Sequence, residues 1–141
     1  MPNVYETEKL LAEYLLFHYG EPTEILPYSF GPKNALDFAT RCVTENVDTS
    51  ELNMYSRALD IGCAVGRTTF ELARHCGEVV GIDYSQAFVD AGNTLQREGF
   101  LDYRRLQEGD IYLRSVAAVD PDIDRSRVAF ETGDAQDLSK D

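Results

Sequence analysis

Hydrophobic residues recur at helical spacing near the start of the chain, over residues 5–20. The positions that form this apolar stripe are Leu10, Leu11, Tyr14, Leu15, Phe17 and His18. A stripe with this period predicts an amphipathic helix. Thr7 is placed to cap the first turn of that helix, and Gly20 is placed to end it.

Two further segments precede the central part of the sequence. Residues 21–33 are rich in proline and predict a loop. Residues 34–46 predict a second helix, with Asn34 as its cap. A polar linker follows over residues 47–56. The first part of the chain is therefore expected to be helical.

The pattern then changes to short apolar runs that alternate with amphipathic helices. The order is strand, helix, strand, helix over residues 56–66, 67–77, 78–85 and 85–100, with Ser85 as the cap of the second helix. Residues 127–138 predict a third strand with a loop at its carboxyl end, whereas residues 99–126 form a connection that the pattern leaves open between helix and strand. This alternation predicts an α/β fold, a partial Rossmann-like doubly wound parallel sheet of three strands preceded by N-terminal helices.

Composition and charge narrow the class of protein. The chain has 141 residues, 43% of them hydrophobic and 27% charged, which fits one folded domain. The formal net charge is −12. Because phosphate backbones and anionic lipids attract basic surfaces, this charge argues against nucleic acid and membranes and for a small-molecule substrate.

The cysteines predict neither a metal site nor a disulfide framework. Cys42, Cys63 and Cys76 are odd in number and show no C-x-x-C spacing. Reduced thiols are the rule inside cells, so we expect a cytoplasmic protein with no bound metal.

The most informative segment is the turn that joins the first strand to its helix. Gly62 and Gly66 let the backbone turn sharply and let a ligand approach closely. The turn lacks the G-x-G-x-x-G of dinucleotide-binding proteins, because Ala64 and Arg67 stand at two of the glycine positions. The carboxylate of Asp60 opposes a pyrophosphate and suits a ligand that carries a positive charge.

The next two strands also end in acidic residues. Asp83 closes the second strand, where a carboxylate can bind both hydroxyls of a ribose. Asp134 follows the third strand, and the N–H of Ala135 is placed to contact an adenine ring. Each aspartate alone is more often a capping or turn residue. Together, at successive strand ends, they predict a site for one extended nucleoside.

Three stretches resemble the first three motifs of class I S-adenosylmethionine-dependent methyltransferases. They read ALDIGCAVGRTTFELA, VVGIDYS and FETGDAQDL. The resemblance implies S-adenosylmethionine as cofactor and S-adenosylhomocysteine as product, with the turn at the methionine part, Asp83 at the ribose and Asp134 with Ala135 at the adenine. The implied cofactor-binding residues are Asp60, Gly62, Cys63, Ala64, Gly66, Asp83, Tyr84, Asp134 and Ala135. Many members of the family have glycine in place of Ala64.

A narrower resemblance includes the N-terminal region. YETEKLLAEYLLFHYG, ILPYSFGPKNALDFATRCV and DIDRSRVAFETGDA are similar to the methyltransferase module of ovothiol biosynthesis, the 4-mercaptohistidine N1-methyltransferases. That family has cysteine where this chain has Gln136. The resemblance implies N-methylation of the imidazole of a thiol-substituted histidine. Candidates for the acceptor pocket are Tyr5, Tyr14, His18, Tyr19 and Tyr28, although Tyr14 and His18 share a helix face and could simply pack. No catalytic residue is predicted.

The resemblance also divides the chain and leaves alternatives. Residues 1–56 are expected on the acceptor side, and residues 57–141 are expected to be the cofactor-binding half of a truncated domain. The family's fold has seven strands, so the chain is either a shortened or natural fragment or a half that completes its sheet as a homodimer. The competing functions are a cofactor-binding fragment without catalysis, a nicotinamide-dependent oxidoreductase and a structural role.

Overall fold

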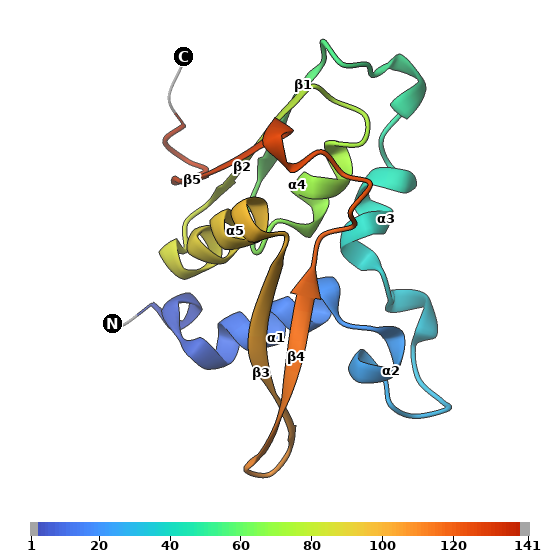
Figure 1. Ribbon diagram of the computed structural model, residues 1–141, viewed down its shortest axis with the longest axis vertical. Helices are drawn as coiled ribbons and strands as arrows, with labels where there is room; N and C mark the ends of the chain where they lie inside the picture. Colours follow the sequence, from blue (N-terminus) through green and yellow to red (C-terminus); the bar gives the residue numbers. More distant parts are fainter. Residues whose placement is uncertain (1–2, 139–141) are drawn as a thin grey trace.

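A computed structural model describes residues 3–138 and shows an α/β fold built around a parallel sheet (Figure 1). The elements of this central part are β1 (Arg57–Ile61), α4 (Arg67–Leu72), β2 (Glu78–Asp83), α5 (Gln86–Glu98) and β5 (Val128–Thr132). The strand order is β1-β2-β5, and both pairs are parallel. The predicted alternation of strands and helices is confirmed.

The register of the sheet brings the carboxyl ends of the three strands together. Ile61 of β1 lies opposite Ile82 of β2, and Asp83 lies opposite Thr132 of β5. Each of the loops that follow the strands therefore starts at the same edge of the sheet, where open α/β sheets bind their ligands.

Helices α4 and α5 cover one face of this sheet. Phe130 of β5 is central to the covered face, since its ring lies 5.4 Å from that of Phe70 in α4. Gly81 and Gly92 leave room for this ring, because a Cβ at either position would lie about 3 Å from it. Glycine at these two positions lets α5 pack closely against β2.

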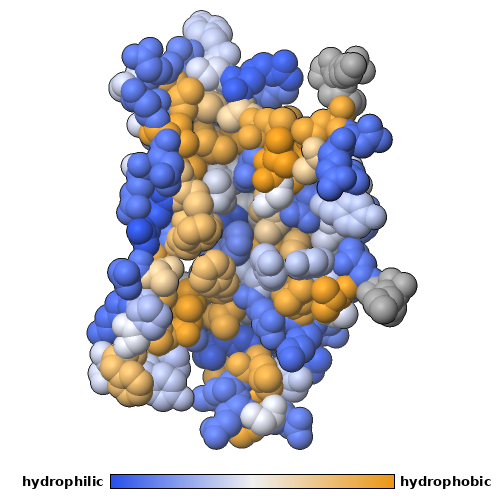
Figure 2. Space-filling view, turned by 180° about the vertical axis from the view of Figure 1, so that it is seen from behind, coloured by the Kyte–Doolittle hydropathy of each residue, from blue (hydrophilic) through white to orange (hydrophobic). Residues whose placement is uncertain are grey.

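The opposite face of the sheet is bare within the described part of the chain. Leu59 and Ile61 are 51% and 50% exposed there, and Val80 and Ile82 are half-buried. Figure 2 shows hydrophobic residues gathered over the upper part of this side, beside the C-terminal end of the described chain. Among residues 3–138, every helix is too short or too polar to traverse a lipid bilayer.

The N-terminal region is helical, with boundaries that differ in part from the prediction. Its elements are η1 (Val4–Glu6), α1 (Glu8–Tyr19), α2 (Pro22–Ile25), η2 (Lys33–Ala35), α3 (Phe38–Thr44) and η3 (Thr49–Glu51). Thr7 caps α1 as predicted, since its Oγ1 accepts the N–H of Leu10 at 3.3 Å. The helix ends at Gly20.

Two local predictions for this region are wrong. The segment 21–33 is not only loop, because Glu21 and Glu24 form a capping box that starts the one-turn helix α2. Asn34 does not cap the next α-helix. It lies within η2, and α3 starts instead after Asp37, whose φ of 56° lies in the left-handed region.

The connection that the pattern left open is an antiparallel hairpin. It consists of β3 (Phe100–Glu108) and β4 (Ile111–Ala118), followed by η4 (Arg125–Arg127), and it forms a sheet of its own. The hairpin lies across α1 (Figure 1). Glu24 of α2 pairs with Arg105 of the hairpin at 3.4 Å and accepts a hydrogen bond from Ser115 at 3.0 Å. It therefore extends the molecule away from the parallel sheet.

Candidate functional site

The glycine turn after β1 is held tightly against the end of β2. The backbone N–H groups of Gly62 and Cys63 both donate to the carbonyl of Ile82, at 2.8 and 3.1 Å. Gly66 has φ of 86°, and a Cβ there would overlap the ring of Phe130. Gly62 has φ of 74°, but no atom lies within 4 Å of its Cβ position. The turn is thus packed on its Gly66 side and open at Gly62, where a ligand can reach the backbone.

Asp83 joins the end of β2 to the glycine turn. Its Oδ2 accepts the N–H of Ala64 at 2.9 Å, and its Oδ1 accepts the N–H of Ser85 at 2.9 Å. A carboxylate oxygen can accept more than one hydrogen bond. The half-buried side chain therefore retains acceptor capacity for two hydroxyls of a ligand.

Asp60 lies beneath the turn and is also half-buried. Its Oδ2 accepts the hydroxyl of Thr69 at 2.7 Å. Burial raises the pKa of Asp60, the Thr69 hydrogen bond lowers it, and the nearby charge of Asp83 raises it again. A cation placed above the turn would relieve both the desolvation and the repulsion between the two carboxylates.

Cys63 turns its side chain inward, where the Sγ donates to the carbonyl of Ala64 at 3.6 Å. Its side chain is 3% exposed and packs in the core. Burial raises the pKa of the thiol, as do the charges of Asp60 and Asp83, so it stays protonated and unreactive.

The end of β5 lies next to the end of β2, so the ends of β1, β2 and β5 form a row along one edge of the sheet. The N–H of Gly133 donates to the carbonyl of Asp83 at 2.9 Å. Asp134 Oδ1 accepts the N–H of Gln136 at 2.8 Å, which forms a local turn, and both Asp134 and Ala135 are exposed. Tyr84, after Asp83, is 72% exposed. The three predicted strand ends thus lie side by side and are linked by hydrogen bonds.

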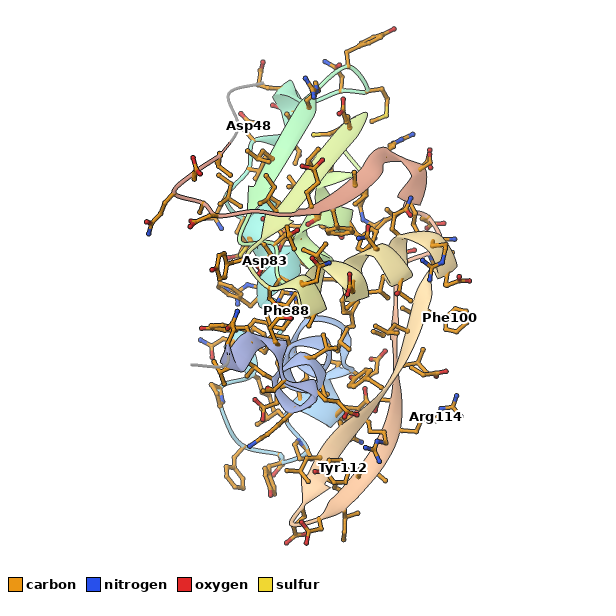
Figure 3. All side chains as sticks on the ribbon, turned by 90° about the vertical axis from the view of Figure 1, so that its left-hand side faces the viewer. Asp48, Asp83, Phe88, Phe100, Tyr112 and Arg114 are labelled. Atoms are coloured by element: carbon orange, nitrogen blue, oxygen red, sulfur yellow. The ribbon has the colours of Figure 1, made fainter. Side chains whose placement is uncertain are left out.

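Three of the predicted acceptor-side residues cluster beside this row. The ring of Tyr14 lies 6.5 Å from that of Tyr5 and 5.9 Å from that of His18. The same tyrosine packs on Phe88 of α5, with ring centroids 4.6 Å apart. In Figure 3, Asp83 lies at the end of the parallel sheet that faces α1, and Phe88 lies between Asp83 and α1. Tyr28 differs from these three residues, because its side chain is 64% exposed and its ring stacks on that of Phe30.

His18 is held neutral in this cluster. Burial lowers its pKa to about 4, with a further lowering from the charge of Arg67. Its Nδ1 is buried and has no hydrogen-bond partner among the described residues. Tyr19, the other candidate on this helix, donates its hydroxyl to the carbonyl of Val65 in the glycine turn at 2.9 Å.

Arg67 is a site residue that the sequence patterns did not single out as part of a binding site. Its guanidinium lies over the ring of Tyr19, 5.4 Å from the centroid, and its Nε donates to the hydroxyl of Thr40 at 3.3 Å. Its only signal in the sequence is its place directly after the last turn glycine. Across residues 3–138, no three His, Cys, Asp or Glu side chains are grouped so that they could hold a metal ion.

Comparison with known proteins gives one family and one curated relative. Residues 59–122 match the family described as "Methyltransferase domain". The 23S rRNA (uracil(1939)-C(5))-methyltransferase of Alkalilimnicola ehrlichii is 30% identical over 101 residues, which cover 72% of this chain. The match spans only 22% of that relative's length.

Two solved structures are similar to the chain. The YcgJ protein from Bacillus subtilis superposes on 64% of this chain and 28% of its own, with a TM-score of 0.42 and 22% identity. Phosphoethanolamine N-methyltransferase 1 of Haemonchus contortus, in complex with phosphoethanolamine and S-adenosylhomocysteine, superposes on 96% of this chain and 24% of its own, with a TM-score of 0.49 and 13% identity. The part of this chain over residues 59–122, which includes the glycine turn after β1, is thus similar to a methyltransferase domain.

Proposed function

We propose that this chain is the cofactor-binding side of an enzyme that transfers the methyl group of S-adenosylmethionine to an imidazole nitrogen of a thiol-substituted histidine. One observation carries the cofactor part of the proposal. The carboxyl ends of β1, β2 and β5 are adjacent and carry Asp60, Asp83 and Asp134 in that order. Three carboxylates along one sheet edge suit a ligand that is extended and carries a positive charge, as a sulfonium nucleoside does.

Each part of the row is proposed to contact one part of the cofactor. Asp83 binds the ribose hydroxyls with the acceptor capacity left by Ala64 and Ser85. Asp60 faces the methionine part, whose positive charges suit a desolvated carboxylate. Asp134 and the backbone of Ala135 contact the adenine. The open space at Gly62 fits a ligand that lies directly on the turn.

The chain's part in methyl transfer is to orient the reactants and to exclude water. When bound, the cofactor would supply a methyl group that its sulfonium sulfur makes electrophilic; the methyl carbon would pass to a nitrogen lone pair as its bond to sulfur breaks, which leaves the electron pair on the neutral thioether of S-adenosylhomocysteine. Because a neutral imidazole nitrogen is nucleophilic as it stands, alignment and desolvation can supply most of the rate without a strong general base. No residue of this chain is assigned as a catalytic residue.

We place the acceptor near the aromatic cluster that residues 1–56 provide. Tyr5, Tyr14 and His18 offer flat apolar surfaces for an imidazole ring. A neutral His18 adds no positive charge beside a sulfonium. Tyr28, exposed on the preceding connection, is proposed as an outer contact.

Two other parts of the proposal concern partners. The net charge of −12 favours a small-molecule acceptor over RNA, although the curated relative's name assigns it 23S rRNA.

The unpaired edge of β1 is proposed to pair with a second copy of the chain, which light scattering at increasing concentration would detect as a dimer.

Cofactor binding is tested by titrating S-adenosylhomocysteine into the protein and into a matched pair of variants. Gly62→Ala and Gly109→Ala both place an alanine at positive φ where no atom lies within 4 Å of the new Cβ. Only Gly62 lies at the proposed site, so we expect Gly62→Ala to weaken binding by at least about tenfold and Gly109→Ala to leave it unchanged. Equal effects of the two substitutions would contradict the site.

Methyl transfer is tested with methyl-labelled S-adenosylmethionine and three acceptors: thiol-substituted histidine, histidine and an RNA fragment. The proposal predicts label on the imidazole nitrogen of the thiol-substituted histidine. Label on RNA instead would assign a nucleic-acid substrate. Cofactor binding with no labelled product would favour a cofactor-binding fragment that does not catalyse transfer.

A further inference from the structure

The carboxylate of Glu6 is bound to the start of helix α5, eighty residues further along the chain. Its Oε1 accepts the N–H of Gln86 at 2.9 Å, and its Oε2 accepts the N–H of Ala87 at 3.1 Å. The neighbouring carbonyl of Tyr5 accepts the hydroxyl of Ser85 at 3.0 Å. Three hydrogen bonds therefore fix η1 to the first turn of α5.

These bonds satisfy N–H groups that an α-helix leaves unpaired at its first turn. Ser85 caps the helix from within, since its Oγ accepts the N–H of Phe88 at 3.2 Å. Glu6 supplies acceptors for the two N–H groups between them. A negative charge is also favourable at a helix N-terminus, because the peptide dipoles leave partial positive charge there. The contact is thus stronger with an acidic side chain than with a neutral one.

The place of the contact links it to the cofactor site. Ser85 follows Asp83 by two residues, and its N–H is one of the two donors to that carboxylate. The bond from Glu6 holds Tyr5 against α5, with its ring 6.0 Å from Phe88 and 6.5 Å from Tyr14. Residues 3–7 consequently form a wall beside the carboxyl end of β2.

We infer that Glu6 is a positioning residue for the cofactor site, which couples docking of the N-terminal segment to nucleoside binding. The inference rests on the proposed function. When Glu6 is bound to α5, the segment closes one side of the site and fixes the backbone next to Asp83. Such coupling is reciprocal. A nucleoside that contacts this wall makes the free energy of docking more favourable, and docking makes the free energy of nucleoside binding more favourable by the same amount.

The test compares Glu6→Ala and Glu6→Gln with Glu13→Ala. Alanine removes both acceptors, glutamine keeps one oxygen, and Glu13 is an exposed residue of α1 that pairs only with Lys9 among the described residues. We expect Glu6→Ala to weaken S-adenosylhomocysteine binding by about tenfold, Glu6→Gln to have an intermediate effect, and Glu13→Ala to have none. Affinity in Glu6→Ala within twofold of the unmodified protein would overturn the inference.

Hydrogen exchange supplies a readout that a loss of fold would not mimic. In the unmodified protein, S-adenosylhomocysteine is expected to slow amide exchange in residues 4–19 as well as around Asp83. In Glu6→Ala, saturating ligand is expected to protect the region of Asp83 but no longer residues 4–19. Protection of residues 4–19 that is equal in both proteins would also overturn the coupling.

An Asp83→Ala variant separates this inference from the proposed function. If Asp83→Ala loses affinity while Glu6→Ala retains it, the cofactor site stands and the positioning role of Glu6 fails. If Asp83→Ala binds as tightly as the unmodified protein, the proposed site itself is wrong.

Discussion

The side chain of Asp83 binds the backbone of Ala64, with Oδ2 accepting its N–H at 2.9 Å. Ala64 is one of two described non-glycine residues with positive φ, at 47°. The carboxylate at the end of β2 thus holds an alanine in a conformation that favours glycine. The geometry of the glycine turn therefore depends on a residue from the next strand.

Ala64→Gly is expected to stabilise the protein slightly. Glycine removes the strain of an alanine at positive φ, but it also gives the unfolded chain more conformational entropy. Because the strain is the larger of these two free energies, we expect the free energy of unfolding to rise by about 0.5 kcal/mol. Ala58→Gly, in the regular strand β1, is the control and should lower it by about 1 kcal/mol. Urea denaturation measures both, and a loss of equal size in the two variants would contradict the strain at Ala64.

Gly66→Ala is expected to destabilise the protein strongly. Besides its positive φ, the new Cβ would overlap the ring of Phe130, which is packed against Phe70 and cannot retreat freely. We expect the free energy of unfolding to fall by about 3 kcal/mol, against about 1 kcal/mol for Gly109→Ala, where φ is also positive but the space is open. Thermal unfolding gives the comparison, and similar melting temperatures for the two variants would contradict it.

Asp60→Asn is expected to weaken the binding of S-adenosylmethionine more than the binding of S-adenosylhomocysteine. The carboxamide oxygen still accepts the hydroxyl of Thr69, but the negative charge is gone. S-adenosylmethionine carries a sulfonium charge that S-adenosylhomocysteine lacks. We expect affinity for the first to fall by about tenfold and affinity for the second, which keeps only the α-ammonium charge, to fall less, as calorimetric titration of both ligands would show.

The same substitution has an expected pH dependence of stability. Burial raises the pKa of Asp60 in the folded state, so its charged form opposes folding at neutral pH. Asp60→Asn should therefore be at least as stable as the unmodified protein at neutral pH. Its advantage should shrink as the pH falls from the raised folded-state pKa of Asp60 towards the ordinary value of 3.8, because the carboxyl takes up its proton first in the folded state and is neutral in both states at still lower pH. An advantage that grows on acidification would be the contrary result.

His18 is expected to contribute to acid unfolding. Its pKa is about 4 in the folded protein, against the ordinary value of 6.5 in the unfolded chain, so the unfolded chain takes up a proton first as the pH falls. The contribution of His18 to the free energy of unfolding is therefore complete above pH 6.5. It falls by at most about 3 kcal/mol as the pH is lowered towards 4. His18→Phe keeps an aromatic ring without a titrating group and should show a shallower loss over this range. Urea denaturation at a series of pH values would reveal equal slopes if the expectation is wrong.

The sequence predicts the parts of the fold that local signals determine. Thr7 and Ser85 cap their helices as expected, because a side chain and an N–H three residues away suffice for a cap. The three strand ends follow from chain order and the handedness of βαβ units. The α3 boundary was missed because Asp37 adopts positive φ, which its sequence context does not announce.

Contacts between distant segments explain what the sequence could not predict. The hairpin β3–β4 buries Tyr103, Ser115 and Ala117 while many of its other residues are exposed, so it lacks a clean alternating pattern. In the candidate site, the contact of Glu6 with Gln86 spans eighty residues, and that of Tyr19 with Val65 spans forty-six. Such contacts depend on tertiary packing and leave no periodic signal along the chain.

The two ends of the hairpin meet, since the N–H of Val119 donates to the carbonyl of Gly99 at 2.9 Å. The chain leaves the layer that contains the parallel sheet and returns to it at almost the same point. Its far tip, at Gly109, has open space around it. This tip is consequently a suitable insertion site. A fluorescent label or an affinity peptide inserted there would not contact a ligand at the strand ends, so it could be used to follow binding without disturbing it.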